Sequence, residues 1–303
     1  MNLIQIGKLS ENEAREYIEK LRWPNGVECA HCGSMGKIYE LSGKSTRPGL
    51  YKCGACRKQF TVTVGTVMHR SRLTMKQWLV CFHQMASSKK GISSLQLQRE
   101  LGIGQYKSAW FLSHRIRCAM EEKPIKDMLS GTVEVDETYV GGKPRGGNND
   151  DVKRGRGTKK TPVMALVSRK GKAFSKPVER VNAEQLKGAI REMVHANATI
   201  ITDEWPSYAG IGNEFAGGHE TVNHGKHEYA RGDVHTNTAE SYFSLLKRGV
   251  MGAFHHVSKK HLPLYCNEFS FRWNNRETSD GERTNAAIRG IAGKRLIYKM
   301  KAA

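Results

Sequence analysis

The chain has 303 residues, and its 49 Lys and Arg residues outnumber 29 Asp and Glu residues, which gives a formal net charge of +20. This length allows one full hydrophobic core together with one or two small accessory modules. The charge favours a polyanionic partner, nucleic acid first, because basic side chains that neutralise phosphates release condensed counterions. No apolar run approaches the roughly 18 residues of a membrane span, and the apolar run at the start is too short for a signal peptide. The sequence therefore predicts a soluble, cytoplasmic protein without a membrane partner.

The first predicted module combines a short helix with a metal site. Residues 10–22 begin with a capping box, since Ser10 can cap the helix and Glu13 follows three residues later. Two C-x2-C pairs, separated by twenty residues, come next: Cys29, Cys32, Cys53 and Cys56. This is the spacing of a tetrahedral four-cysteine zinc site. Four protein ligands leave no open position, so we expect a structural rather than a catalytic Zn²⁺.

Residues 73–122 are predicted to be helical, and the part from 89 to 120 resembles a helix-turn-helix, with glycines at the turn. The second helix of such a motif enters the major groove of DNA. Its basic residues are therefore candidate DNA contacts: Lys107, Arg115 and Arg117. Many ordinary helical hairpins have the same pattern, and the sequence leaves that alternative open.

From residue 132 the pattern becomes that of a sheet. Strands are predicted at 133–140, 162–169, 176–181 and 198–203, with a helix at 183–195 and further helices from about 238. Three strands, a helix, a strand and more helices indicate one mixed α/β domain in the second half of the chain.

The connection between the first two strands is rich in glycine and basic residues. Its candidate DNA contacts are Lys153, Arg154, Arg156, Lys159 and Lys160. A flexible, solvated hairpin and a loop that closes on phosphates fit this composition equally well.

Two aspartates stand at positions that favour metal binding. Asp136 lies inside an apolar strand, where a lone carboxylate is costly unless it is paired or bound to a metal. Asp203 ends the strand ATIITD, at the kind of strand terminus that commonly opens into a site. Transfer of a phosphodiester can use two Mg²⁺ ions roughly 4 Å apart, and these hard cations require oxygen ligands. Each aspartate alone also fits a turn or capping role.

A predicted helix beginning near residue 237 supplies further candidates. Glu240 lies near its start, and Lys247 follows seven residues later, two turns on and therefore on the same face. The carboxylate could complete a metal site, while Lys247 and the adjacent Arg248 could hold a DNA phosphate. A solvated Glu/Lys pair on a surface helix is the alternative interpretation.

Three long motifs carry a family resemblance: VDETYVGGK, ITDEWPSY and HTNTAESYFSLLKRGVMGAFHHVSKKHLPLYCNEFSFRWNNR. Together with the four-cysteine segment, over about residues 27–276, they resemble the insertion-sequence transposases of the IS1595 group that carry an ISXO2-like domain. The resemblance implies an RNase H-like, retroviral-integrase-type α/β fold and an acidic metal triad of the DDE kind. By position, Asp136 and Asp203 match the first two members, and Lys247 matches the lysine after the third.

The third member of the triad has two candidates. Glu240 follows Asp203 by the expected interval and is the better Mg²⁺ ligand, since a carboxylate binds this ion better than an amide. The group is also described with asparagine at this position, and Asn237 stands one turn earlier.

The sequence thus predicts four segments: an N-terminal helix and zinc ribbon (1–70), a helical DNA-binding region (71–125), an RNase H-like catalytic domain (126–280) and a basic C-terminal tail (281–303). The expected activity is cleavage at the ends of an insertion sequence and transfer of the 3′-hydroxyl into target DNA, with Mg²⁺ or Mn²⁺. The resemblance further implies a homo-oligomer acting near the bacterial nucleoid. A DNA-binding regulator with an inactive core and a hydrolytic nuclease of the same fold are the alternatives.

Overall fold

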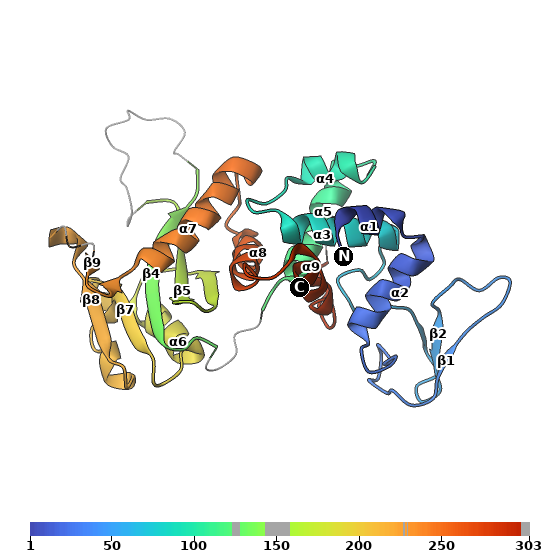
Figure 1. Cartoon of the computed structure of the whole chain (residues 1–303), viewed down its shortest axis with the longest axis horizontal. Helices are drawn as coiled ribbons and strands as arrows, with labels where there is room; N and C mark the ends of the chain where they lie inside the picture. Colours follow the sequence, from blue (N-terminus) through green and yellow to red (C-terminus); the bar gives the residue numbers. More distant parts are fainter. Residues whose placement is uncertain (123–127, 143–157, 227, 229, 298–303) are drawn as a thin grey trace. The chain divides into compact units, whose positions relative to one another are not determined.

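The computed structural model describes residues 1–122, 128–142, 158–226, 228 and 230–297 (Figure 1). The chain divides into two compact units. Unit 1 comprises Met1–Glu121 and Glu277–Ala303, and unit 2 comprises Glu122–Arg276. In the described part of the chain, no helix is both long enough and apolar enough to cross a membrane.

Unit 1 is built mainly from helices, whose bounds are α1 (Leu3–Lys8), α2 (Glu11–Arg22), α3 (Met75–Ser87), α4 (Ser94–Glu100), α5 (Tyr106–Ala119) and α9 (Asp280–Arg289). The predicted capping box starts α2: the Ser10 hydroxyl accepts from the backbone N–H of Glu13, and the Glu13 carboxylate accepts from the backbone N–H of Ser10. Both bonds satisfy N–H groups that a helix start otherwise leaves unpaired.

A small antiparallel sheet follows α2 in the order β1 (Ile38–Glu40), β2 (Tyr51–Cys53) and β3 (Gln59–Phe60). Its strands are too short to supply many backbone hydrogen bonds. Three aromatic rings pack beside it, with Trp23 edge-on to both Tyr51 and Phe60 at centroid distances of 5.7 and 6.1 Å. This apolar cluster covers one side of the sheet.

The C-terminal segment differs from the predicted tail. Its helix α9 packs against α2 and α3 within unit 1. The side chains of Ala287, Ile288 and Ile291 are fully buried, and His83 Nδ1 lies 3.0 Å from Thr284 Oγ1. The apolar face of this segment is therefore part of the core of unit 1, although residues 281–303 as a whole are basic.

Unit 2 contains a five-stranded mixed sheet in the order β6-β5-β4-β7-β8. Its strands are β4 (Thr132–Val140), β5 (Thr161–Ser168), β6 (Ala173–Pro177), β7 (Thr199–Asp203) and β8 (His219–Val222). The first three form an antiparallel meander, whereas β7 is parallel to β4 and β8 is parallel to β7. This is the RNase H-like arrangement implied by the family resemblance, and the predicted fold class is confirmed.

Helices cover both faces of this sheet. One apolar cluster joins Val133 and Val135 of β4 to α6 (Ala183–Met193). The other joins Val140 of β4 and several residues of β5 to α7 (Asn237–Gly249) and α8 (Leu262–Asn274). Since side chains alternate along a strand, Glu134 and Asp136 fall on the α7 face.

Shorter elements complete unit 2: the helical turns η2 (Pro206–Tyr208), η3 (Ile211–Glu214), η4 (His224–Lys226) and η5 (Val250–Phe254), and the strands β9 (Ala230–Arg231) and β10 (Val234–His235). The predicted third strand begins earlier than expected. A tight turn, in which the Ser168 N–H donates to the Lys172 carbonyl, lets β6 start at Ala173.

Candidate active site and metal centre

Three carboxylates converge where the carboxyl end of β7 lies beside the middle of β4. The two parallel strands pair Glu134 with Ile201, so Asp136 and Asp203 each stand two residues further along. One oxygen each from Asp136, Glu137 and Asp203 can be chosen so that all three atoms lie within 4.8 Å of one another. The register of β4 and β7 thus builds a cluster of oxygen ligands, the donor type that Mg²⁺ and Mn²⁺ prefer.

The cluster strongly perturbs the Asp136 carboxyl. Burial, together with the negative charges of Glu137, Asp203 and Glu240, raises the pKa of Asp136 to about 7, although the Glu137 N–H, which donates to Asp136 Oδ1 at 2.7 Å, acts to lower it. In the protein alone, Asp136 therefore remains partly protonated at neutral pH. A bound divalent cation would favour the charged form.

Glu137 is a further member of this cluster that the sequence did not predict. The Tyr208 hydroxyl donates to Glu137 Oε1, and burial together with the Glu137 charge raises the pKa of Tyr208 well above its usual value. The phenol therefore stays protonated and orients one oxygen of Glu137. The sequence feature that could have identified Glu137 is its position directly after Asp136 in the motif VDET.

Helix α7 forms the opposite wall of an open pocket of about 480 Å³. The pocket is lined by Asp136, Glu137, Thr138, Glu240, Phe243, Ser244, Lys247 and Arg248. The structure therefore brings Glu240, Lys247 and Arg248 to the wall that faces Asp136, and the charge of Glu240 acts on the Asp136 carboxyl. Asn237 is exposed at the first residue of α7 and is not part of this lining.

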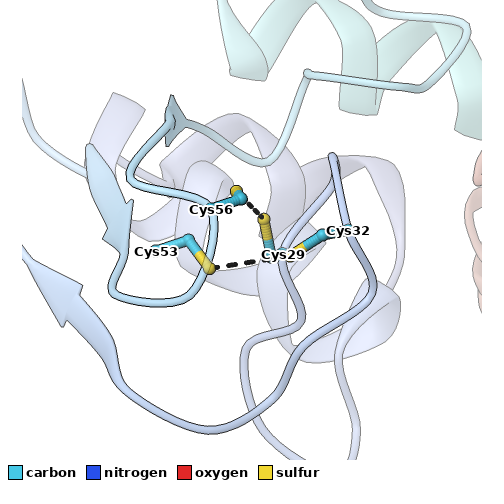
Figure 2. A group of neighbouring side chains, drawn as sticks. All are labelled: Cys29, Cys32, Cys53 and Cys56. Carbon is cyan, nitrogen blue, oxygen red and sulfur yellow. Dashed lines mark hydrogen bonds between the residues drawn. The ribbon is translucent and has the colours of Figure 1, made fainter.

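A second ligand cluster lies in unit 1, where two turns carry the four cysteines (Figure 2). The Sγ atoms of Cys29 and Cys56 are 3.6 Å apart, and those of Cys32 and Cys53 are 3.7 Å apart. Four sulfurs at 2.3 Å from one Zn²⁺ in a tetrahedron are about 3.8 Å from each other. The thiol positions therefore fit a structural zinc ion. Hydrogen bonds, that from the Cys56 backbone N–H first, lower the pKa of the Cys53 thiol to about 7, whereas burial and the neighbouring thiols raise the pKa of Cys32, so the metal-free cluster favours one thiolate at Cys53.

Comparison with known proteins agrees with both clusters. The model of the ISXO2-like transposase domain matches residues 128–274, and that of the transposase zinc-ribbon domain matches residues 9–59. An uncharacterized transposase-like protein of Haemophilus influenzae is 30% identical over 109 residues, which span 36% of this chain and 85% of that protein. The chain belongs to the ISXO2-like transposases.

A longer relative of this transposase is an uncharacterized protein in the transposable element ISH50 of Halobacterium salinarum. It is 28% identical over 275 residues, which cover 87% of this chain and 91% of the relative. Two solved structures are also similar, the Mos1 strand transfer complex and the Mos1 transposase paired-end complex with the left transposon end. Their TM-scores are 0.24 and 0.23, with 14% and 15% identity over 66% of this chain and 77% and 78% of theirs. Scores this low do not establish a shared fold, which is instead given by the order of the strands.

The predicted helix pair of the transposase is present as α4 and α5. Ser94 Oγ of α4 lies 3.0 Å from Ser113 Oγ of α5, and Gly102 adopts a φ of +63° in the turn between them. Lys107 lies in the first turn of α5 and is exposed, and Arg115 is half-buried. Both residues remain predicted DNA contacts.

Arg117 requires a correction. It is fully buried, and its guanidinium donates to Ser113 Oγ and approaches His114 Nδ1, both at 3.1 Å. The side chain therefore points into unit 1, which contradicts the predicted contact with DNA. Of the basic loop in the transposase, Lys153, Arg154 and Arg156 lie outside the described residues, whereas Lys159 and Lys160 directly precede β5.

Proposed function

We propose that this transposase cleaves DNA at the ends of its insertion sequence and joins the released 3′-hydroxyl to target DNA with the help of divalent metal ions. The observation that carries this proposal is the convergence of Asp136, Glu137 and Asp203 beside a pocket whose other wall carries Lys247 and Arg248. Carboxylates alone suit a metal site, and the neighbouring Lys247 and Arg248 suit a phosphate.

The residues divide into two roles. Asp136 and Asp203 would hold the metal, Mg²⁺ or Mn²⁺, which supplies an activated water or hydroxyl and stabilises the leaving oxygen. Lys247 and Arg248, on the α7 wall, would bind the DNA phosphate and orient the scissile bond. Asp136 lines the same pocket as Lys247 and Arg248, and a carboxylate oxygen of Asp203 can lie within 4.8 Å of one of Asp136, so a phosphodiester bound to these cations would lie next to the metal ligands.

For the third ligand we favour Glu240 over Asn237. Glu240 lines the pocket and acts electrostatically on Asp136, whereas Asn237 lies outside the lining. Glu137 is an additional candidate, since its carboxylate oxygen can meet those of Asp136 and Asp203 within 4.8 Å.

DNA recognition is assigned to unit 1. The residues Arg70, Ser71, Arg72, Leu73, Trp78, Ser108, Phe111, Leu112 and Arg115 line a pocket of about 280 Å³ that includes the start of α5. Among the residues that the structure describes, no carboxylate forms an ion pair with Arg70, Arg72 or Arg115. Uncompensated guanidinium groups are suited to phosphates. With the zinc ribbon as a folded support, this surface would hold the element's ends, on which two copies of the chain would act together.

The test is incubation of the full-length protein with DNA that carries the element's ends and a target duplex, in Mg²⁺ or Mn²⁺. We expect end-specific nicks and joined products from the wild type, and neither from Asp136→Ala or Asp203→Ala. Nicks without joined products would indicate a hydrolytic nuclease. End-specific binding without metal-dependent cleavage would indicate a regulator.

A further inference from the structure

Glu134 is a fully buried acidic residue two positions before Asp136 on β4. Residues two apart on a strand point to the same face, so both side chains face α7. An ionised carboxylate is costly to bury unless hydrogen bonds and an opposite charge compensate it. The contacts of Glu134 show what this residue does.

One oxygen of Glu134 caps helix α7. Glu134 Oε2 accepts from the backbone N–H of Thr238 at 2.7 Å and from that of Ala239 at 2.9 Å. The Thr238 hydroxyl also donates to Glu134 Oε1 at 2.9 Å. Within the described chain, the side chain of Thr236, the N-cap residue of α7, makes no capping hydrogen bond. A residue 104 positions earlier in the sequence therefore performs the capping, and its negative charge meets the positive end of the helix dipole.

The other oxygen binds a cation from the end of β5. Arg169 Nε donates to Glu134 Oε1 at 2.6 Å, and Arg169 Nη2 donates to the carbonyl oxygen of His235 at 2.9 Å. His235 immediately precedes the N-cap of α7. Glu134 and Arg169 thus fix the start of α7 from two sides. Because both Glu134 oxygens are engaged, this carboxylate is not available as a metal ligand.

We propose that Glu134 is a positioning residue that holds the start of α7 at a fixed place beside Asp136. We call the contacts of Glu134 with Thr238, Ala239 and Arg169 the Glu134 clamp. Consecutive Cα atoms advance about 3.4 Å along a strand, so the Cα atom of Glu134 is only about 7 Å from that of Asp136. Glu240 directly follows Ala239, whose N–H is held by the clamp, and Lys247 lies two turns further along α7. A shift of the helix start therefore moves the third carboxylate and the phosphate-binding cations together. This inference rests on the proposed function.

The test compares Glu134→Gln and Glu134→Ala with Glu268→Gln in full-length, zinc-containing protein. Glu268 is a matched control because it is also fully buried in unit 2 and paired with a basic residue, Arg272 at 2.7 Å, but it lies in α8. Cleavage of end-bearing DNA is measured as a function of Mn²⁺ concentration, below the unfolding temperature of every variant.

We expect both Glu134 variants to cleave roughly 100-fold more slowly at saturating DNA, since misplacement by about 1 Å can cost that much. We expect Glu268→Gln to keep a cleavage rate within about 3-fold of the wild type, even if its Tm falls by as much as the Tm of the Glu134 variants. A similar loss in all three variants would reduce Glu134 to a stabilising residue and overturn the proposal, as would wild-type rates in the Glu134 variants.

A second readout separates this proposal from the proposed function. Amide hydrogen exchange reports the clamp directly, because Thr238 and Ala239 donate their N–H groups to Glu134. We expect faster exchange at the start of α7 in Glu134→Ala, with unchanged exchange in α8. Unchanged exchange at α7 would contradict the clamp. Absence of metal-dependent cleavage in the wild type would contradict the proposed function and leave the exchange result valid.

Discussion

Asp136 and Asp203 stand at equivalent positions of two neighbouring parallel strands, each two residues beyond the pair formed by Glu134 and Ile201. This register places two carboxylates side by side from segments separated by 66 residues of sequence. Their mutual repulsion, together with burial, means that the site is most stable when a proton or a cation is present.

The first prediction concerns the stability of the metal-free protein. The pKa of Asp136 is raised from 3.8 to about 7, because burial and then the neighbouring carboxylates disfavour its charged form. Between these values the folded state binds a proton that the unfolded state releases. The contribution of this group to the free energy of unfolding is therefore full below about pH 4 and is lost as the pH rises through 7.

Asp136→Asn removes this dependence. Without divalent cations, the variant should have a higher Tm than the wild type at pH 8, and the difference should shrink as the pH falls and nearly vanish at pH 3.5. The expected difference is about 2–4 °C for each kcal/mol of relieved penalty. Addition of Mg²⁺ or Mn²⁺ at pH 8 should raise the Tm of the wild type but not that of the variant. A wild type that is more stable than Asp136→Asn at pH 8 without metal would show that the carboxyl is not destabilised.

The second prediction decides the third metal ligand. Glu240→Gln should reduce cleavage by more than the roughly 10- to 100-fold typical of residues behind a metal's direct ligands. Asn237→Ala should retain most of the activity, since Asn237 is exposed and lies outside the lining of the pocket. Glu137→Gln tests the remaining candidate in the same assay. A larger loss in Asn237→Ala than in Glu240→Gln would reverse the assignment.

The third prediction concerns zinc. The strands of the ribbon are two or three residues long, so the metal should supply much of its stability. Cys53→Ser should lower the zinc content from one ion per chain to nearly none and should lower the Tm of the protein. Cys118→Ser is the control, because Cys118 is half-buried and lies outside the cluster. Equal zinc content in the two variants would argue against a four-cysteine site.

The fourth prediction separates DNA contact from packing in unit 1. Arg72 is exposed and lines the pocket of unit 1 that also contains Arg70 and Arg115. Arg72→Ala should weaken binding of end DNA and lower the slope of log K against log salt concentration by about 1, without changing the Tm. Arg117→Ala should destabilise the protein by about 2–5 kcal/mol, because a large buried side chain is removed. The slope of log K for DNA binding against log salt concentration should stay at the wild-type value in Arg117→Ala. The opposite pattern would place Arg117 rather than Arg72 at the DNA.

Much of the site could be predicted because its signals are local. The spacing of Cys29, Cys32, Cys53 and Cys56 defines a ligand set without knowledge of the fold, and the structure brings the four together. Asp136 stood out because a charge inside an apolar strand needs a partner. The apolar strand pattern around Asp136 can also be read from neighbouring residues alone. The predicted strand 133–140 agrees with β4, which extends from 132 to 140.

The roles that could not be predicted from the sequence depend on contacts between residues that are distant in sequence. Strand alternation places Glu137 on the face opposite to Asp136, and its approach to the cluster depends on Tyr208 and on the end of β7. The clamp formed by Glu134 joins residues more than 100 positions apart. Arg117 was assigned to the surface because helical spacing alone does not tell which face of α5 is covered by the rest of unit 1.

The most direct test of the central claim is Mn²⁺ binding by the full-length, zinc-containing protein, measured by electron paramagnetic resonance of the free ion at pH 8 without DNA. The wild type should bind Mn²⁺ at a site that is lost in both Asp136→Ala and Asp203→Ala and retained in Cys118→Ser. Equal Mn²⁺ binding by the wild type and the two aspartate variants would contradict a metal site formed by Asp136 and Asp203.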